Sequence, residues 1–190
     1  MAHLPSSSPP LLLISDSGLG LVWRLDAATG NYSVHYRHET MAPTTDLGLL
    51  LGINGLRYLD GHVYYVNSPR RLFARYPVDP RTGAVAGEAR VLAEGVLSDD
   101  FNVRKENGGP VGYLAGLNDN VVTRVTLDGA KEVVAGGLNS STVAGATSGA
   151  WGRTAVDEDV LYVTTGGASA APVNGTFVEG GKIVALTLAE

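Results

Sequence analysis

The chain has 190 residues, a length typical of one domain with enough material to bury a sizeable core. Its 19 acidic and 14 basic residues give a formal net charge of -5 at pH 7, so it lacks the basic surface that binds a nucleic-acid backbone. The absence of cysteine excludes a disulfide scaffold, a thiolate metal site and a cysteine nucleophile. We therefore expect no nucleic-acid partner.

The first ten residues, MAHLPSSSPP, are rich in Ser and Pro, and we expect residues 1–10 to be a disordered segment. The apolar run LLLI that follows is too short to span a membrane. No basic stretch and no cleavage site mark a signal peptide. The sequence therefore predicts no membrane partner and leaves the localisation open.

Three kinds of β-like segment recur along the rest of the chain. Four apolar runs stand about 50 residues apart: LLLISDS, HVYYVNS, VGYLAGL and VLYVTTG. The first three are each followed by a second run that ends in a turn: LVWRLDAATG, RLFARYPVDPRTG and VVTRVTLDG. The last three are each preceded by another type of segment: GINGLRYLDG, SDDFNVRKENGG and TSGAWGRTAVDED. Short strands repeating at this period, with Gly and Asp turns between them, are typical of β-propeller blades.

These repeats predict an all-β chain that forms a β-propeller of about four blades. We expect one domain over residues 11–190, with blades at roughly 11–50, 51–96, 97–144 and 145–190. The first blade should begin at its second strand, and GGKIVALTLAE should be the third strand of the last blade. Because closed propellers pair their terminal strands, such a chain should expose blade edges and self-associate through them.

From about residue 12 onward, the repeated segments resemble the later blades of the senescence marker protein/gluconolactonase family, also called regucalcin-like. They are most similar to its fungal branch, whose members are often secreted. The resemblance implies a six-bladed parent whose N-terminal blades this chain lacks. It also implies a divalent cation, usually calcium, at the mouth of the central channel, and hydrolysis of sugar lactones as the activity.

The same resemblance assigns site residues. It places a metal-ligating Asn on Asn54, and a metal-ligating Asp that also serves as the catalytic base on Asp99. Asp100 stands where the family has Gly, and the family's first ligand, a Glu, has no counterpart. Carboxylate and amide oxygens suit calcium, which would polarise a lactone carbonyl and acidify a bound water. Two protein ligands are too few for a tight site, so we expect this machinery to be partial at best.

Each candidate also has an ordinary structural interpretation. The Asn-Gly pair at Asn54 is a strong turn signal. Asp99 and Asp100 are adjacent, so in a regular strand only one of them can face the channel. We expect one of the two to be a turn or capping residue.

Three small polar residues near blade ends, together with Asp100, are the candidates for a substrate pocket: Asp16, Asn67 and Ser148. Small polar residues also end strands for turn reasons alone. His35 and His38 form an H-x-x-H pair in an outer strand, where we expect them to be exposed rather than to bind zinc.

Three functions remain open at this stage. The first is a metal-dependent, lactonase-like hydrolase acting on a small-molecule substrate. The second is a non-catalytic small-molecule binder, or a cyclase-like propeller of fungal secondary metabolism, which uses the channel without the full set of metal ligands. The third is an inactive, truncated paralogue.

Overall fold

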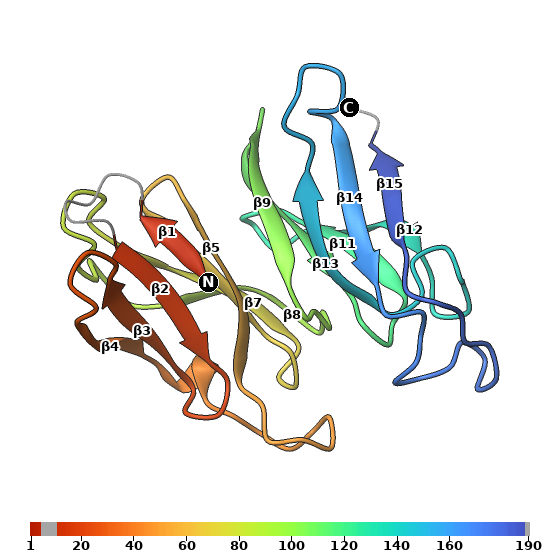
Figure 1. The fold of residues 1–190 in the computed structure, drawn as a ribbon, viewed down its shortest axis with the longest axis horizontal. Helices are drawn as coiled ribbons and strands as arrows, with labels where there is room; N and C mark the ends of the chain where they lie inside the picture. Colours follow the sequence, from red (N-terminus) through yellow and green to blue (C-terminus); the bar gives the residue numbers. More distant parts are fainter. Residues whose placement is uncertain (5–10, 189–190) are drawn as a thin grey trace. The chain divides into compact units, whose positions relative to one another are not determined.

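The computed structural model describes residues 1–4 and 11–188, and these form four antiparallel sheets (Figure 1). One 3-10 turn, η1 (Glu39–Met41), accompanies the strands. The prediction of an all-β chain with about four repeats is therefore confirmed. Within the described residues, no helix is long and apolar enough to cross a membrane.

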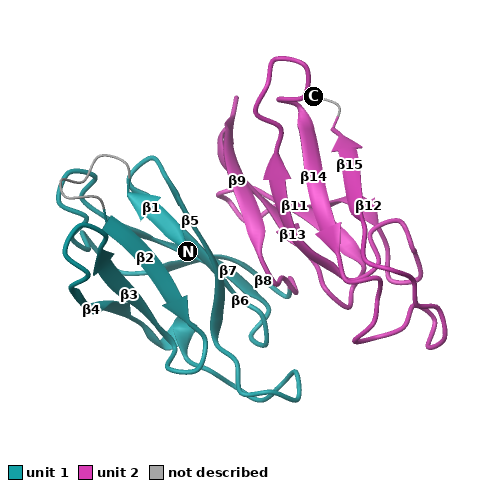
Figure 2. Ribbon diagram, viewed as in Figure 1, with its two compact units in different colours: residues 1–95 teal, residues 96–190 magenta. Residues whose placement is uncertain are grey.

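The chain divides into two compact units, residues 1–95 and 96–190, coloured separately in Figure 2. Each unit contains two sheets. The single domain predicted over residues 11–190 stays a prediction.

The first unit contains two four-stranded sheets whose strands pair in chain order. The first sheet comprises β1 (Ala2–Leu4), β2 (Leu11–Asp16), β3 (Leu21–Asp26) and β4 (Tyr32–Arg37). The second comprises β5 (Ile53–Leu59), β6 (His62–Asn67), β7 (Leu72–Pro77) and β8 (Arg90–Glu94). A shared core of aliphatic side chains and tyrosines, among them the fully buried Tyr65 and Tyr76, joins these sheets.

The second unit contains one four-stranded and one three-stranded sheet. The four-stranded sheet comprises β9 (Phe101–Glu106), β10 (Gly109–Ala115), β11 (Val121–Val125) and β12 (Lys131–Gly136). The three-stranded sheet comprises β13 (Ala146–Trp151), β14 (Val160–Thr165) and β15 (Ile183–Thr187). Residues of both sheets, among them Val111, Val122, Leu161 and Val163, form one core.

The sequence repeats correspond to equivalent strands. The four apolar runs become the second strands β2, β6, β10 and β14, which are flanked on both sides and therefore carry the most continuous apolar character. The segments LVWRLDAATG and RLFARYPVDPRTG share an Asp-x-x-Thr-Gly motif, at Asp26–Gly30 and Asp79–Gly83, which lies in the connection between third and fourth strands. In the two copies, Asp26 and Asp79 accept hydrogen bonds from backbone N–H groups two and three residues ahead, and these bonds lower the pKa of both carboxyl groups.

Two expectations about local structure are wrong. The segment expected to be disordered contains β1, which pairs with β2, so the first sheet does not begin at its second strand. Burial of Ala2 and Leu4 explains this pairing, and three residues are too few to give a readable alternation. Residues 5–10 lie outside the described residues.

The second correction concerns the histidines of the H-x-x-H pair. His35 and His38 are half-buried rather than exposed. The ring of His35 packs against Tyr76, with ring centroids 5.9 Å apart. Burial lowers the pKa of His35 to about 4.

Candidate functional site

An irregular pairing marks the start of strand β5, which lies at one edge of its sheet. Ile53 pairs with Asn67 and Leu56 with Tyr65, so two residues on β5 face one on β6. Asn54 lies within this bulge. A β-bulge redirects side chains out of the regular alternation and is common beside functional sites.

The same irregularity recurs twice in the second unit. Before β9, the N–H of Asp99 donates to the Ala115 carbonyl, while the N–H of Ala115 donates to the Asp100 carbonyl. Both aspartates therefore face one residue of the neighbouring strand. On β13, the register shifts between Ala146 and Ser148. Adjacent residues at a bulge need not point to opposite faces, so simple alternation does not decide which aspartate is oriented toward a ligand.

The registers make Asn54, Asp99 and Thr147 equivalent positions in three successive sheets. Asp100 and Ser148 occupy the next position. Thr147 was not among the site residues predicted from the sequence, although its position in the repeat could have identified it as a candidate. Each of the edge strands β5, β9 and β13 thus has a small polar residue at, or just before, its beginning.

In the second unit these residues form a hydrogen-bonded group. The Ser148 hydroxyl donates to Asp100 Oδ2 at 2.8 Å and so links β13 to the segment before β9. The hydroxyls of Thr147 and Thr164 lie 3.0 Å apart, and Thr164 Oγ1 donates to the Ser148 carbonyl at 3.3 Å. We call Asp100, Thr147, Ser148 and Thr164 the inner-strand cluster. It offers hydroxyl donors and a carboxylate acceptor on half-buried to exposed side chains.

In the first unit, Asn54 and Asn67 differ in their contacts. Asn54 Nδ2 donates to Ser68 Oγ at 3.1 Å from a half-buried position. Asn67 is fully buried, and its Nδ2 donates to the carbonyls of Thr40 and Ala42 at 2.9 and 3.1 Å. These bonds account for the polarity of Asn67 without a ligand.

Asp16 also has a local structural role. Its carboxylate accepts hydrogen bonds from the Trp23 indole N–H at 3.1 Å and from the Leu19 backbone N–H at 2.9 Å. The bond from Trp23 is the main reason that the pKa of Asp16 is lowered. The pocket roles predicted for Asp16 and Asn67 stay predictions.

The described residues do not assemble the carboxylate-rich donor set of a calcium site. Within residues 1–4 and 11–188, no three or more His, Asp or Glu side chains gather where they could hold a metal ion. Calcium takes six to eight oxygen ligands. Asn54 belongs to the first unit and Asp99 to the second, so their pairing as metal ligands stays a prediction.

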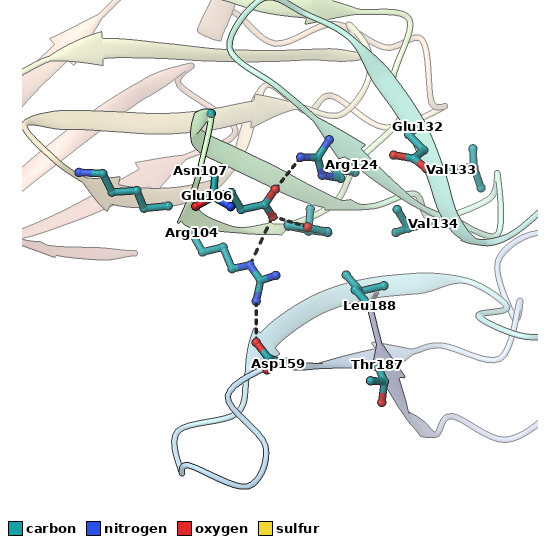
Figure 3. Close-up of a pocket in the computed structure, with 13 residues that line it drawn as sticks. Arg104, Glu106, Asn107, Arg124, Glu132, Val133, Val134, Asp159, Thr187 and Leu188 are labelled. Carbon is teal, nitrogen blue, oxygen red and sulfur yellow. Dashed lines mark hydrogen bonds and ion pairs between the residues drawn. The ribbon is translucent and has the colours of Figure 1, made fainter. Parts of the chain in front are cut away.

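A groove of about 1120 Å³ lies elsewhere in the second unit (Figure 3). Glu106 is its central charge and accepts hydrogen bonds from Tyr113, Arg124 and Arg104. Burial opposes ionisation of Glu106, but the bonds from Tyr113 and Arg124 outweigh it and lower its pKa. The Arg104 guanidinium also stacks on Trp151, 3.6 Å from the ring centroid. Arg104 belongs to β9 and Trp151 to β13, so this stacking links the two sheets of the unit.

Comparison with known proteins gives relatives of two kinds. No family model matches the chain. By sequence, it is 30% identical over 158 residues to a protein of Sarocladium schorii provisionally named hetero-Diels-Alderase asR5. It is 31% identical over 156 residues to another provisionally named hetero-Diels-Alderase, from a Phoma species. These matches cover 77% and 76% of the chain but 39% and 42% of the relatives, so the chain spans about two fifths of their length.

By structure, the chain resembles solved propeller proteins. A luciferin-regenerating enzyme matches with a TM-score of 0.59 at 16% identity, over 92% of this chain and 56% of its own. A calcium-binding regucalcin from Agrobacterium tumefaciens matches with a TM-score of 0.50 at 21% identity, over 79% and 45%. A gluconolactonase-family structure matches with a TM-score of 0.50 at 17% identity, over 87% and 47%. The predicted resemblance to regucalcin and gluconolactonase propellers is thus confirmed in the fold.

Proposed function

We propose that this chain forms part of a cyclase-like propeller that catalyses a hetero-Diels-Alder cycloaddition. The observation that carries the proposal is the identity of 30% and 31% to two proteins named for that reaction. The lactonase-like neighbours are 17% to 21% identical and support the fold alone.

The inner-strand cluster is suited to this chemistry. In the reaction, a heterodiene and an alkene form two σ bonds, and three π bonds become one. No group leaves, and neither an oxidant nor a metal is required for the balance. A protein accelerates such a bimolecular step by holding both partners in one orientation. It gains further by directing hydrogen-bond donors at the heteroatom on which charge develops.

We assign these tasks to named residues. The Thr147 hydroxyl, which in the structure donates to the Thr164 carbonyl at 3.2 Å, would turn to donate to the heteroatom of the diene. The Ser148 hydroxyl donates its single proton to Asp100 and thereby holds that carboxylate in place beside the substrate. Asp99, one residue earlier, would accept a hydrogen bond from a substrate hydroxyl.

The experiment uses the purified 190-residue chain with a β,γ-unsaturated α-ketoester as heterodiene and ethyl vinyl ether as alkene. Chiral chromatography separates the two enantiomers of the dihydropyran product. We expect an enantiomeric excess that persists in EDTA, since the uncatalysed background is racemic. A racemic product formed at the background rate would contradict the proposal.

Lactone hydrolysis is the second candidate, favoured by the equivalent positions of Asn54 and Asp99 and by the regucalcin-like fold. In that function Asp99 is the base, and a divalent cation, calcium or another, would be held by Asn54 and Asp99 together with further ligands. Its test is hydrolysis of a sugar lactone with added calcium and with EDTA. Calcium-dependent turnover lost in Asp99→Asn would favour the hydrolase over the cycloaddition catalyst.

A further inference from the structure

The sequence contains three Asn-Gly pairs, at Asn54, Asn107 and Asn174. Asparagine is a thermolabile residue. A following glycine favours loss of its side-chain amide, because a residue without a Cβ hinders neither the attack of its own nitrogen nor the backbone rotation that the attack requires. In this reaction the glycine nitrogen must approach the Cγ atom of the asparagine. The three pairs are chemically equal, so the fold decides which of them reacts.

Asn107 and Gly108 form the exposed turn between β9 and β10. A Cβ placed on Gly108 would meet nothing within 4 Å beyond its chain neighbours. Within residues 1–4 and 11–188, no hydrogen bond holds the Asn107 side chain or the Gly108 N–H. The two groups that must meet, the carboxamide and the nitrogen, are therefore both free to move.

Asn54 has the opposite environment. It lies in strand β5, its Nδ2 donates to Ser68 Oγ at 3.1 Å, and the following Gly55 is buried. An asparagine that is held in a strand cannot turn its Cγ atom toward the next nitrogen without local unfolding. The fold thus protects the amide of this candidate site residue.

Asn174 is intermediate between the two. It is exposed, but its φ of 53° places it in a left-handed turn, which the pairing of Val173 with Phe177 closes. The Gly175 N–H donates to the Pro172 carbonyl at 2.9 Å. The attacking nitrogen is therefore engaged in a hydrogen bond that must break before the reaction.

We infer that Asn107 is a site of spontaneous covalent modification. The Gly108 nitrogen forms a bond with Asn107 Cγ, the Cγ–Nδ2 bond breaks, and the amide nitrogen leaves as ammonia with the Gly108 proton. Water then opens the cyclic imide at either of its carbonyls, which gives aspartate or isoaspartate. The sequence of steps consumes water alone and changes no oxidation state.

The product changes the groove of Figure 3, which Asn107 lines next to Glu106. A neutral amide becomes a carboxylate, so the modified chain gains negative charge at neutral pH. Glu106 keeps its hydrogen bonds from Tyr113, Arg124 and Arg104, and we therefore expect the modified chain to stay folded. Aged protein should separate by anion exchange into charge forms that are all folded.

Peptide mapping by mass spectrometry tests the site on the purified 190-residue chain. The chain is kept in mildly alkaline buffer and, in parallel, in concentrated guanidinium chloride, and aspartate plus isoaspartate are quantified over time. In buffer, Asn107 should be modified at least about tenfold faster than Asn54, which a hydrogen bond and the strand hold in place, with Asn174 between them. In guanidinium chloride the three rates should become similar, because the local sequence is then the same.

Gly108→Ala is the matched variant, because the structure has room for its Cβ and that Cβ hinders the attacking nitrogen. It should slow modification at Asn107 and leave the rates at Asn54 and Asn174 unchanged, which also shows that the variant is folded. The inference is overturned if Asn54 or Asn174 is modified as fast as Asn107 in buffer. It is also overturned if the differences persist in guanidinium chloride, or if Gly108→Ala leaves the rate at Asn107 unchanged.

Discussion

At the scale of one residue, Asn54 and Asn67 show that sequence alone does not distinguish a structural asparagine from a candidate site residue. Asn54 and Asn67 both come from segments with turn character, and both were candidates for a site. Only the structure distinguishes the half-buried Asn54 from the fully buried Asn67, whose amide binds two backbone carbonyls. The carbonyl partners come from residues 25 and 27 positions earlier, so no local pattern could reveal them.

Replacing Asn67 should destabilise the first unit. Asn67→Ala leaves the carbonyls of Thr40 and Ala42 short of a donor, which should lower the free energy of unfolding by about 2 to 3 kcal/mol. Urea denaturation measures the loss. Asn31→Ala, at an exposed position, is the control and should change stability by less than about 0.5 kcal/mol. Equal effects of the two variants would show that the amide of Asn67 is not structural.

His35 should make stability depend on pH. Its folded pKa of about 4 lies below the ordinary value of 6.5, because burial disfavours the charged ring and Arg24 adds repulsion. Above pH 6.5 the ring is neutral in both states. As the pH falls from 6.5 to 4, only the unfolded chain gains the proton, so stability should fall by roughly 2 to 3 kcal/mol.

His35→Phe is the variant that isolates this effect. The ring packs on Tyr76, and its Nε2 has no hydrogen-bond partner, so phenylalanine should fit without losing a bond. Urea denaturation at pH 7, 6, 5 and 4 should show a smaller decline for His35→Phe than for the unaltered chain. The two chains declining in parallel would contradict the assignment.

At the scale of the element, the repeats predicted the strands well because each strand type keeps its own pattern. Each second strand has a neighbouring strand on both sides, and the turns with Asp and Gly that follow the third strands are local in sequence. Two kinds of feature were not predictable. Strand β1 is too short to show an alternation, and the bulges at β5 and β13 depend on pairing with a partner strand.

Gly136, at the end of β12, should tolerate no side chain. Its φ of 82° is unfavourable for other residues, and a Cβ would lie 2.1 Å from the Asn120 carbonyl oxygen. Gly136→Ala should therefore lower the free energy of unfolding by about 3 kcal/mol. The loss would be measured as a lower midpoint of urea denaturation. Gly137→Ala is the neighbouring control, because its Cβ would have only an ordinary contact at 3.9 Å with Ser140. A stable Gly136→Ala variant would show that this turn can rearrange.

At the scale of the whole molecule, the sequence predicted the all-β propeller-like fold and left three functions open, among them a cyclase-like propeller. Fold follows from a period repeated over the chain, whereas activity depends on a few side chains at strand beginnings. The resemblance indicated a metal and a lactone. We propose instead a cycloaddition in which the polar groups of the inner-strand cluster orient the reactants.

Calcium titration by calorimetry tests whether the whole chain binds calcium. Because the described carboxylates form no group of three, we expect no saturable binding near micromolar calcium on the 190-residue chain. Asn54→Ala and Asp99→Ala should then give the same heats as the unaltered chain. Micromolar binding that both variants abolish would instead assign the two residues as ligands and favour the hydrolase.

The enantiomeric excess of the cycloadduct in EDTA tests the central claim most directly, compared between the unaltered chain and Ser148→Ala. The variant removes the hydroxyl that donates to Asp100. Ser15→Ala, on β2 of the other unit, controls for the loss of a serine hydroxyl as such. We predict an excess for the unaltered chain and for Ser15→Ala, and a loss of at least about tenfold in the rate of the favoured enantiomer for Ser148→Ala. A racemic product from all three proteins, or the same excess from all three, would contradict the assignment of the reaction to the inner-strand cluster.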